Sequence, residues 1–101
     1  MRVKTVSTLP IEIDSLGIVH RRAVVEMDGM IKRQRYRSPY VLISHIEGDP
    51  ATPTGCECML FLCEEDGSVL VWDELCAFYS LKYPEAYIRA IDVMEGTEWQ
   101  S

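Results

Sequence analysis

The sequence predicts one α+β domain spanning residues 1–101, with an antiparallel sheet of about five or six strands and one helix packed on it. Two observations predict the sheet: Asp-Gly pairs at 28–29 and 66–67 each separate β-rich runs, as in β-hairpins. The helix is predicted by apolar residues at helical spacing within 73–83. At 101 residues and 48% hydrophobic content, the chain is large enough to bury a core.

The first predicted strand covers 3–7 and is expected at an edge of the sheet. The first hairpin joins 18–27 to 30–37 through a two-residue turn at Asp28-Gly29, which sets Met27 opposite Met30. Alternation then predicts an apolar face formed by Val19, Ala23, Val25, Met27, Met30 and Tyr36. The opposite face is predicted to be cationic and to hold His20, Arg22, Arg33, Arg35 and Arg37 around Val24, Glu26 and Ile31.

The middle of the chain contains an interior strand, a loop and a second hairpin. Residues 40–47 are apolar on both faces, which is typical of a strand covered on both sides. Two prolines and two glycines in 48–55 predict a loop. Beyond it, 57–63 and 69–72 are expected to form the second hairpin through 64–68.

The C-terminal third is predicted to begin with a helix near 73–83. Asp73 is its expected N-cap, and Pro84 ends it. The next segment, 86–94, fits either a helix with Pro84 in its first turn or a strand, and its Tyr, Ile and Val content favours the strand. Residues 95–101 form a polar tail, in which Trp99 either docks on the domain or is an exposed binding element.

Charge is divided between the two parts of the chain. Residues 1–40 carry eight Lys or Arg against four acids, a balance of +4, whereas residues 41–101 carry two against twelve, a balance of −10. This asymmetry is informative about partners rather than about fold. The chain has no apolar run of the ~20 residues that span a membrane and no signal-peptide pattern, so we expect a cytoplasmic protein without membrane contact.

No catalytic or cofactor motif stands out. The four cysteines, Cys56, Cys58, Cys63 and Cys76, have poor spacing for zinc and are predicted to be reduced packing residues. We therefore expect no metal and no cofactor. A small Cys-containing metal-binding domain or enzyme, for example one with a Cys76–His45 dyad, is the third functional hypothesis.

The first hypothesis is a non-enzymatic interaction protein, an inhibitor or adaptor of the kind some phages encode, that engages a nucleic-acid-handling protein. The acidic residues Glu64, Glu65 and Asp66 at the second hairpin tip are its predicted contact site. The alternative is direct binding of single-stranded nucleic acid, with Tyr36 or Tyr40 stacking on bases. Its predicted phosphate contacts are Arg22, Arg33, Arg35 and Arg37. An exposed edge strand would also permit a homodimer.

Overall fold

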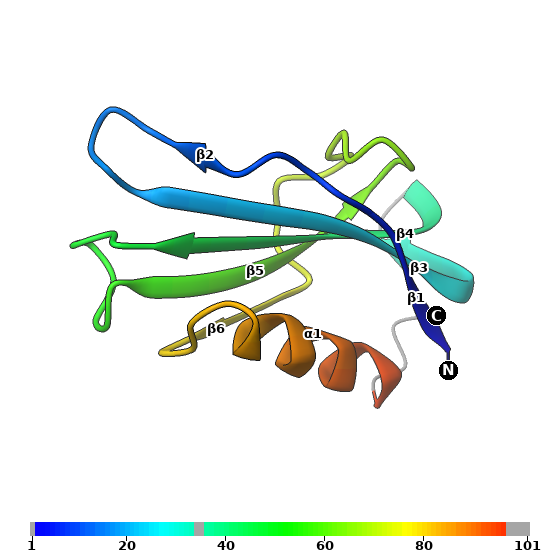
Figure 1. Ribbon diagram of the computed structural model, residues 1–101. Helices are drawn as coiled ribbons and strands as arrows, with labels where there is room; N and C mark the ends of the chain where they lie inside the picture. Colours follow the sequence, from blue (N-terminus) through cyan, green and yellow to red (C-terminus); the bar gives the residue numbers. More distant parts are fainter. Residues whose placement is uncertain (1, 34–35, 97–101) are drawn as a thin grey trace.

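Six strands precede one helix in a computed structural model, which describes residues 2–33 and 36–96 without the side chains of Lys32 and Arg33. The elements are β1 (Val3–Thr8), β2 (Glu12–Ile13), β3 (Val19–Arg33), β4 (Tyr36–Glu47), β5 (Cys56–Cys63), β6 (Cys76–Tyr79) and α1 (Glu85–Glu95). The sheet is antiparallel, in the order β1-β3-β4-β5-β6, and β2 also pairs with β3. α1 packs against one face of this sheet (Figure 1), which confirms the α+β prediction.

The two faces of the sheet are covered differently. On the helix side, Ala86, Ala90 and Met94 of α1 are fully buried at a spacing of four residues, which gives the helix one narrow apolar stripe. This stripe packs with Val25, Met27, Ile31, Val41, Ile43, Cys58, Leu60 and Leu62. On the other face, here called the open side, a smaller cluster contains Val24, Leu42, Phe61 and Cys63. No helix among the described residues is long and apolar enough to cross a membrane.

Three local predictions are confirmed. β1 forms an outer strand of the sheet, as expected for 3–7. β4 lies between β3 and β5, and Val41 and Ile43 are fully buried, as expected for an interior strand. Residues 48–55 connect β4 to β5 without forming a strand.

The predicted turn at Asp28-Gly29 is wrong, because β3 continues through it to Arg33. Between the pairs Glu26↔Tyr40 and Ile31↔Ser38, β3 has four residues where β4 has only Pro39. Proline has no N–H to give to the ladder, so regular pairing is interrupted at this position. The Asp-Gly pair therefore serves a bulge, in which Gly29 adopts φ +81°.

The bulge changes which side chains are buried beyond it. Ala23, Val25 and Met27 are buried as predicted. Met30 and Tyr36 were expected on the apolar face but are exposed, whereas Ile31, expected among the arginines, is buried in the helix-side core. A register argument that extends through a bulge assigns the wrong face to each residue that follows.

The helix prediction near 73–83 is also wrong, and so is the preference for a strand over 86–94. Residues 76–79 form β6, which pairs with β5 from Glu57 to Leu60, and the helix is α1 at Glu85–Glu95. The backbone of β5 would otherwise present an unpaired edge beside the core, and pairing with β6 satisfies it. Residues 69–72 form only one bridge, Cys63↔Val69, so the second hairpin begins as predicted but becomes regular only at β6.

Candidate functional site

A groove of about 670 Å³ lies on the open side of the sheet. Its floor is formed by Leu42 and Ile46 of β4 with Met59 and Phe61 of β5. Glu12 of β2 lines it as well, together with the connection between β5 and β6, residues 64–75, through Val69 and Trp72. Pockets of roughly 300–1,000 Å³ with an apolar lining and a few polar groups are typical binding sites.

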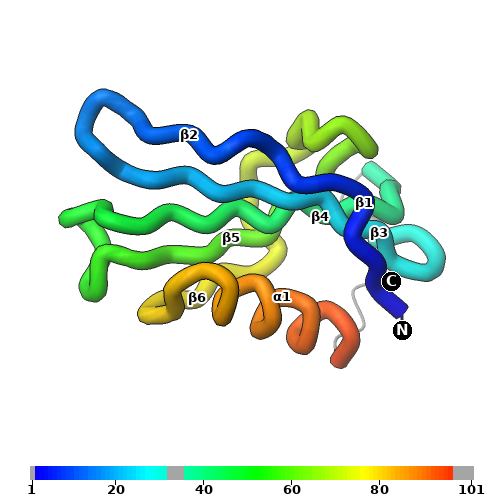
Figure 2. The backbone as a smooth tube through the Cα atoms, viewed as in Figure 1, coloured from blue at the N-terminus to red at the C-terminus, as the bar shows by residue number. Residues whose placement is uncertain are grey.

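Strand alternation explains the floor. In β4, Val41, Ile43 and His45 point to the helix side, so Leu42 and Ile46 point to the open side. Leu42 is the cross-strand partner of Phe61. In the backbone trace, α1 lies on only one side of the sheet (Figure 2). On the other side, these apolar side chains depend on the β5–β6 connection for cover, for example through Val69.

Gly67 lets that connection approach the sheet. It adopts φ +91°, and a Cβ atom there would lie 3.2 Å from Cδ1 of Leu9 and 3.4 Å from Cγ2 of Val24. An L side chain would meet both a strained backbone and this contact. Gly67 therefore lines the groove at a point where the connection packs closely against Leu9 and Val24.

Trp72 is the most exposed large apolar side chain of the groove, with 75% of its surface accessible. Its ring lies edge-on to Phe61, with 5.4 Å between the ring centroids. Edge-to-face packing of this kind orients an aromatic side chain. The groove thus presents an oriented indole to solvent.

The two basic residues of the groove are both paired with carboxylates. Arg22 Nη2 donates to Glu12 Oε1 at 2.9 Å, and His20 Nε2 donates to Asp14 Oδ2 at 3.0 Å. The hydrogen bond from His20 lowers the pKa of Asp14, and Asp14 Oδ1 also accepts the backbone N–H groups of Leu16 and Ile18. Arg22 Nε is enclosed and has no hydrogen-bond partner among the described residues. Both basic side chains of the groove therefore already have a carboxylate partner.

The predicted acidic site, Glu64, Glu65 and Asp66, is exposed and directly precedes the Gly67-Ser68 segment that lines the groove. Asp66 Oδ1 accepts the N–H of Ser68 at 2.9 Å, which lowers the pKa of Asp66. The Tyr40 hydroxyl donates to Glu65 Oε2 at 3.2 Å. We call Glu64, Glu65 and Asp66 the acidic turn; it borders one end of the groove.

The predicted arginine site is distributed along the hairpin. Arg22 lies opposite Ser44, whereas exposed Arg37 lies opposite Lys32, seven positions away along β4 and roughly 23 Å at the usual strand rise. The side chains of Arg33 and Arg35 lie outside the described part of the chain, as does Trp99.

The cysteines are free thiols; Cys56, Cys58 and Cys63 are buried and Cys76 is half-buried. Burial raises the pKa of Cys58 and of Cys63 to about 12, so both are protonated near neutral pH. Within residues 2–33 and 36–96, no three His, Cys, Asp or Glu side chains are grouped in a way that could hold a metal ion.

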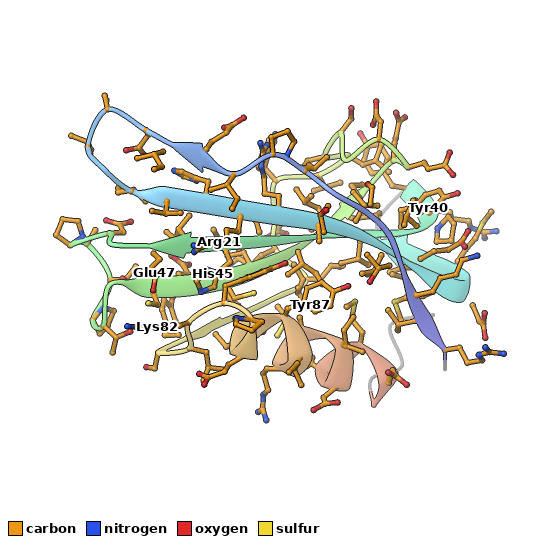
Figure 3. The ribbon with its side chains drawn as sticks, in the orientation of Figure 1. Arg21, Tyr40, His45, Glu47, Lys82 and Tyr87 are labelled. Atoms are coloured by element: carbon orange, nitrogen blue, oxygen red, sulfur yellow. The ribbon has the colours of Figure 1, made fainter. Side chains whose placement is uncertain are left out.

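His45 belongs to a polar cluster on the helix side, at the end of the sheet where Arg21 and Glu47 also lie (Figure 3). Its Nε2 donates to the carbonyl of Leu81 at 2.7 Å, and its ring centroid is 5.5 Å from that of Tyr83. Arg21 pairs with Glu47 at 3.1 Å. His45 is fully buried, and its hydrogen bond fixes the segment that leads into α1.

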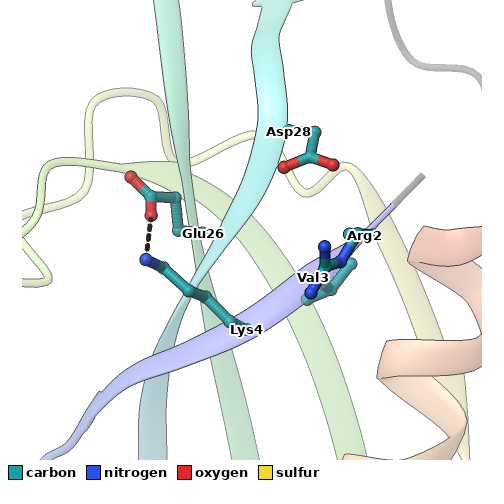
Figure 4. Close-up of a pocket in the computed structure, with 5 residues that line it drawn as sticks. All are labelled: Arg2, Val3, Lys4, Glu26 and Asp28. Atoms are coloured by element: carbon teal, nitrogen blue, oxygen red, sulfur yellow. Dashed lines mark ion pairs between the residues drawn. The ribbon is translucent and has the colours of Figure 1, made fainter.

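A smaller hollow of about 270 Å³ lies where β1 meets β3 (Figure 4). Arg2, Lys4, Glu26 and Asp28 line it, and Lys4 Nζ pairs with Glu26 Oε1 at 3.2 Å. It lacks the apolar floor of the groove, so the groove is the stronger candidate.

Comparisons with protein-family models, with curated proteins and with solved structures found no match to this chain. Sequence reasoning missed the groove, and its prediction that Glu64, Glu65 and Asp66 form a contact site stays a prediction. One signal for the groove was available, because Leu42 and Ile46 alternate with Val41 and Ile43 and therefore require cover on the second face of the strand. The position of Trp72 could not be predicted in this way, because it depends on how the β5–β6 connection folds.

Proposed function

We propose that the protein is a non-enzymatic interaction module, an inhibitor or adaptor, that binds a partner protein through the open side of its sheet. The observation that carries the proposal is Trp72, which is 75% exposed at an apolar groove of about 670 Å³. Exposed aromatic side chains beside a preformed apolar hollow are typical of protein contact surfaces.

Charge supports a nucleic-acid-handling partner. The chain contains no Lys or Arg between Arg37 and Lys82, and eight acids fall in this interval. The acidic turn belongs to it and borders the groove. Proteins that handle nucleic acid carry basic surfaces, which the exposed carboxylates of the acidic turn would complement.

The test is affinity purification of the tagged full chain from its native cells, with and without nuclease. Wild type is compared with Trp72→Ala and with Ile88→Ala, a matched change at an exposed apolar residue of α1. We expect a stoichiometric protein that survives nuclease and whose recovery falls at least about tenfold with Trp72→Ala, equivalent to 1.4 kcal/mol. Ile88→Ala should retain it.

Equal recovery by the two variants would contradict the proposal, provided that both give the wild-type circular dichroism spectrum. A catch that disappears with nuclease would instead favour direct nucleic-acid binding. In that case Arg37→Glu should weaken binding and Trp72→Ala should not.

A further inference from the structure

We infer that the groove accepts a basic peptide segment of the partner, in which a large apolar side chain enters the groove and flanking Lys or Arg side chains contact the acidic turn. This inference rests on the proposed function and specifies the chemistry of the partner. The inference follows from the apolar floor of the groove, from the exposed ring of Trp72 and from the charged residues around them.

The floor selects an apolar side chain. Leu42, Met59 and Phe61 present apolar atoms. Apart from the paired side chains of Glu12, Arg22 and His20, the polar side chains that line the groove among the described residues are Ser44 and Ser68. Burying a leucine or phenylalanine side chain there removes its apolar surface from water, which favours binding. Trp72 adds a largely exposed aromatic ring to the lining of the groove.

The charge balance selects basic flanks. Arg22 and His20 each already have a carboxylate partner, so neither is an unpaired basic side chain that an acidic ligand could bind. The β5–β6 connection contributes the acidic turn and then Asp73 and Glu74, and it contains no Lys or Arg. All five of these acidic residues are exposed. These acidic residues of the β5–β6 connection would repel an anionic segment and attract Lys or Arg side chains.

The experiment uses the full chain with Trp99→Phe, so that tryptophan fluorescence reports Trp72 alone. The probes are three synthetic peptides with blocked ends: Lys-Lys-Leu-Phe-Leu-Lys-Lys, the same peptide with Ala at its three central positions, and Glu-Glu-Leu-Phe-Leu-Glu-Glu. We expect the first to change Trp72 fluorescence and to bind at least about tenfold more tightly than the other two. Its affinity should fall with added salt.

A matched pair of protein variants locates the binding. In fluorescence anisotropy with a labelled first peptide, Trp72→Ala should weaken binding at least about tenfold and Ile88→Ala should leave it unchanged. If the alanine peptide bound as tightly as the first peptide, the apolar groove would not be the binding site. If the glutamate peptide bound as tightly as the first peptide, the acidic residues of the β5–β6 connection would not select basic ligands. Either result, or no binding by any peptide, overturns the inference.

Failure of this inference is distinguishable from failure of the proposed function. If no peptide binds but Trp72→Ala still abolishes capture of the cellular partner, the interaction surface stands and only the basic-peptide chemistry is wrong. If capture is insensitive to Trp72→Ala, the proposed surface itself fails.

Discussion

The groove depends on the backbone conformation of one residue, Gly67. Its φ of +91° brings the β5–β6 connection against the sheet, with Leu9 and Val24 close to where a Cβ would lie. Gly17 provides a natural comparison, because it adopts φ +82° but a Cβ atom there would have no neighbour within 4 Å. The two glycines separate the cost of backbone strain from the cost of contact.

We predict that Gly67→Ala destabilises the fold more than Gly17→Ala. The backbone cost of a positive φ, about 1–2 kcal/mol, applies to both, whereas only the alanine at 67 meets Leu9. Urea unfolding of the two variants measures the difference. Equal losses of unfolding free energy would show that the Leu9 side chain moves away from the new methyl group without destabilising the fold.

The buried thiol of Cys58 predicts a loss of stability at alkaline pH. Its pKa is raised by burial from 9.0 to about 12, so the folded protein retains a proton that the unfolded chain releases. The resulting stability is complete below about pH 9 and declines as the pH rises toward 12. Unfolding free energies from about pH 8 to pH 10 should therefore fall less steeply for Cys58→Ala than for wild type; parallel slopes would contradict this.

At the scale of elements, α1 is held close to the sheet by small residues. Ala86 and Ala90 are fully buried, whereas Ile88 on the same helix is 60% exposed. The helix has no side-chain N-cap hydrogen bond, and no basic residue lies in its last turn. Its position therefore depends mainly on packing rather than on its ends.

Ala90→Leu should test that dependence. Three additional carbon atoms at a fully buried site should cost about 1–3 kcal/mol, because the closely packed core must shift to admit them. The control variant Ile88→Leu, at an exposed position of the same helix, should change the free energy of unfolding by less than about 0.5 kcal/mol. Thermal unfolding monitored by circular dichroism compares them. No difference would show that the interface between helix and sheet is loosely packed.

At the scale of the whole molecule, position of charge and total charge make separate contributions to binding. The formal net charge is −6. The double variant Glu64→Lys, Glu65→Lys changes the acidic turn and keeps Asp66, whose carboxylate holds Ser68. Asp92→Lys with Glu95→Lys makes the same change of four charge units on α1.

We predict that the acidic-turn variant loses most partner binding and that the α1 variant retains it. Both variants have a net charge of −2, so long-range attraction is reduced equally in each. Surface plasmon resonance with the purified partner at two salt concentrations measures both. Equal losses would show that total charge, rather than the acidic turn, controls recognition.

The errors of sequence reasoning have a common physical origin. Asp28-Gly29 satisfied every local criterion for a hairpin turn, but Pro39 across the ladder made it a bulge. Leu75, Phe78 and Tyr79 had helical spacing, yet 76–79 form a strand because β5 needed a partner. In both cases the deciding residues are distant in sequence.

From the amino-acid sequence it was possible to predict the α+β class, β1, the interior position of β4, the loop at 48–55 and the division of charge. These follow from local composition and from alternation along one strand. The folded structure was needed to locate the bulge in β3, the positions of β6 and α1, and the groove lined by Trp72. Those depend on backbone pairing between distant segments and on which face of the sheet the single helix leaves open.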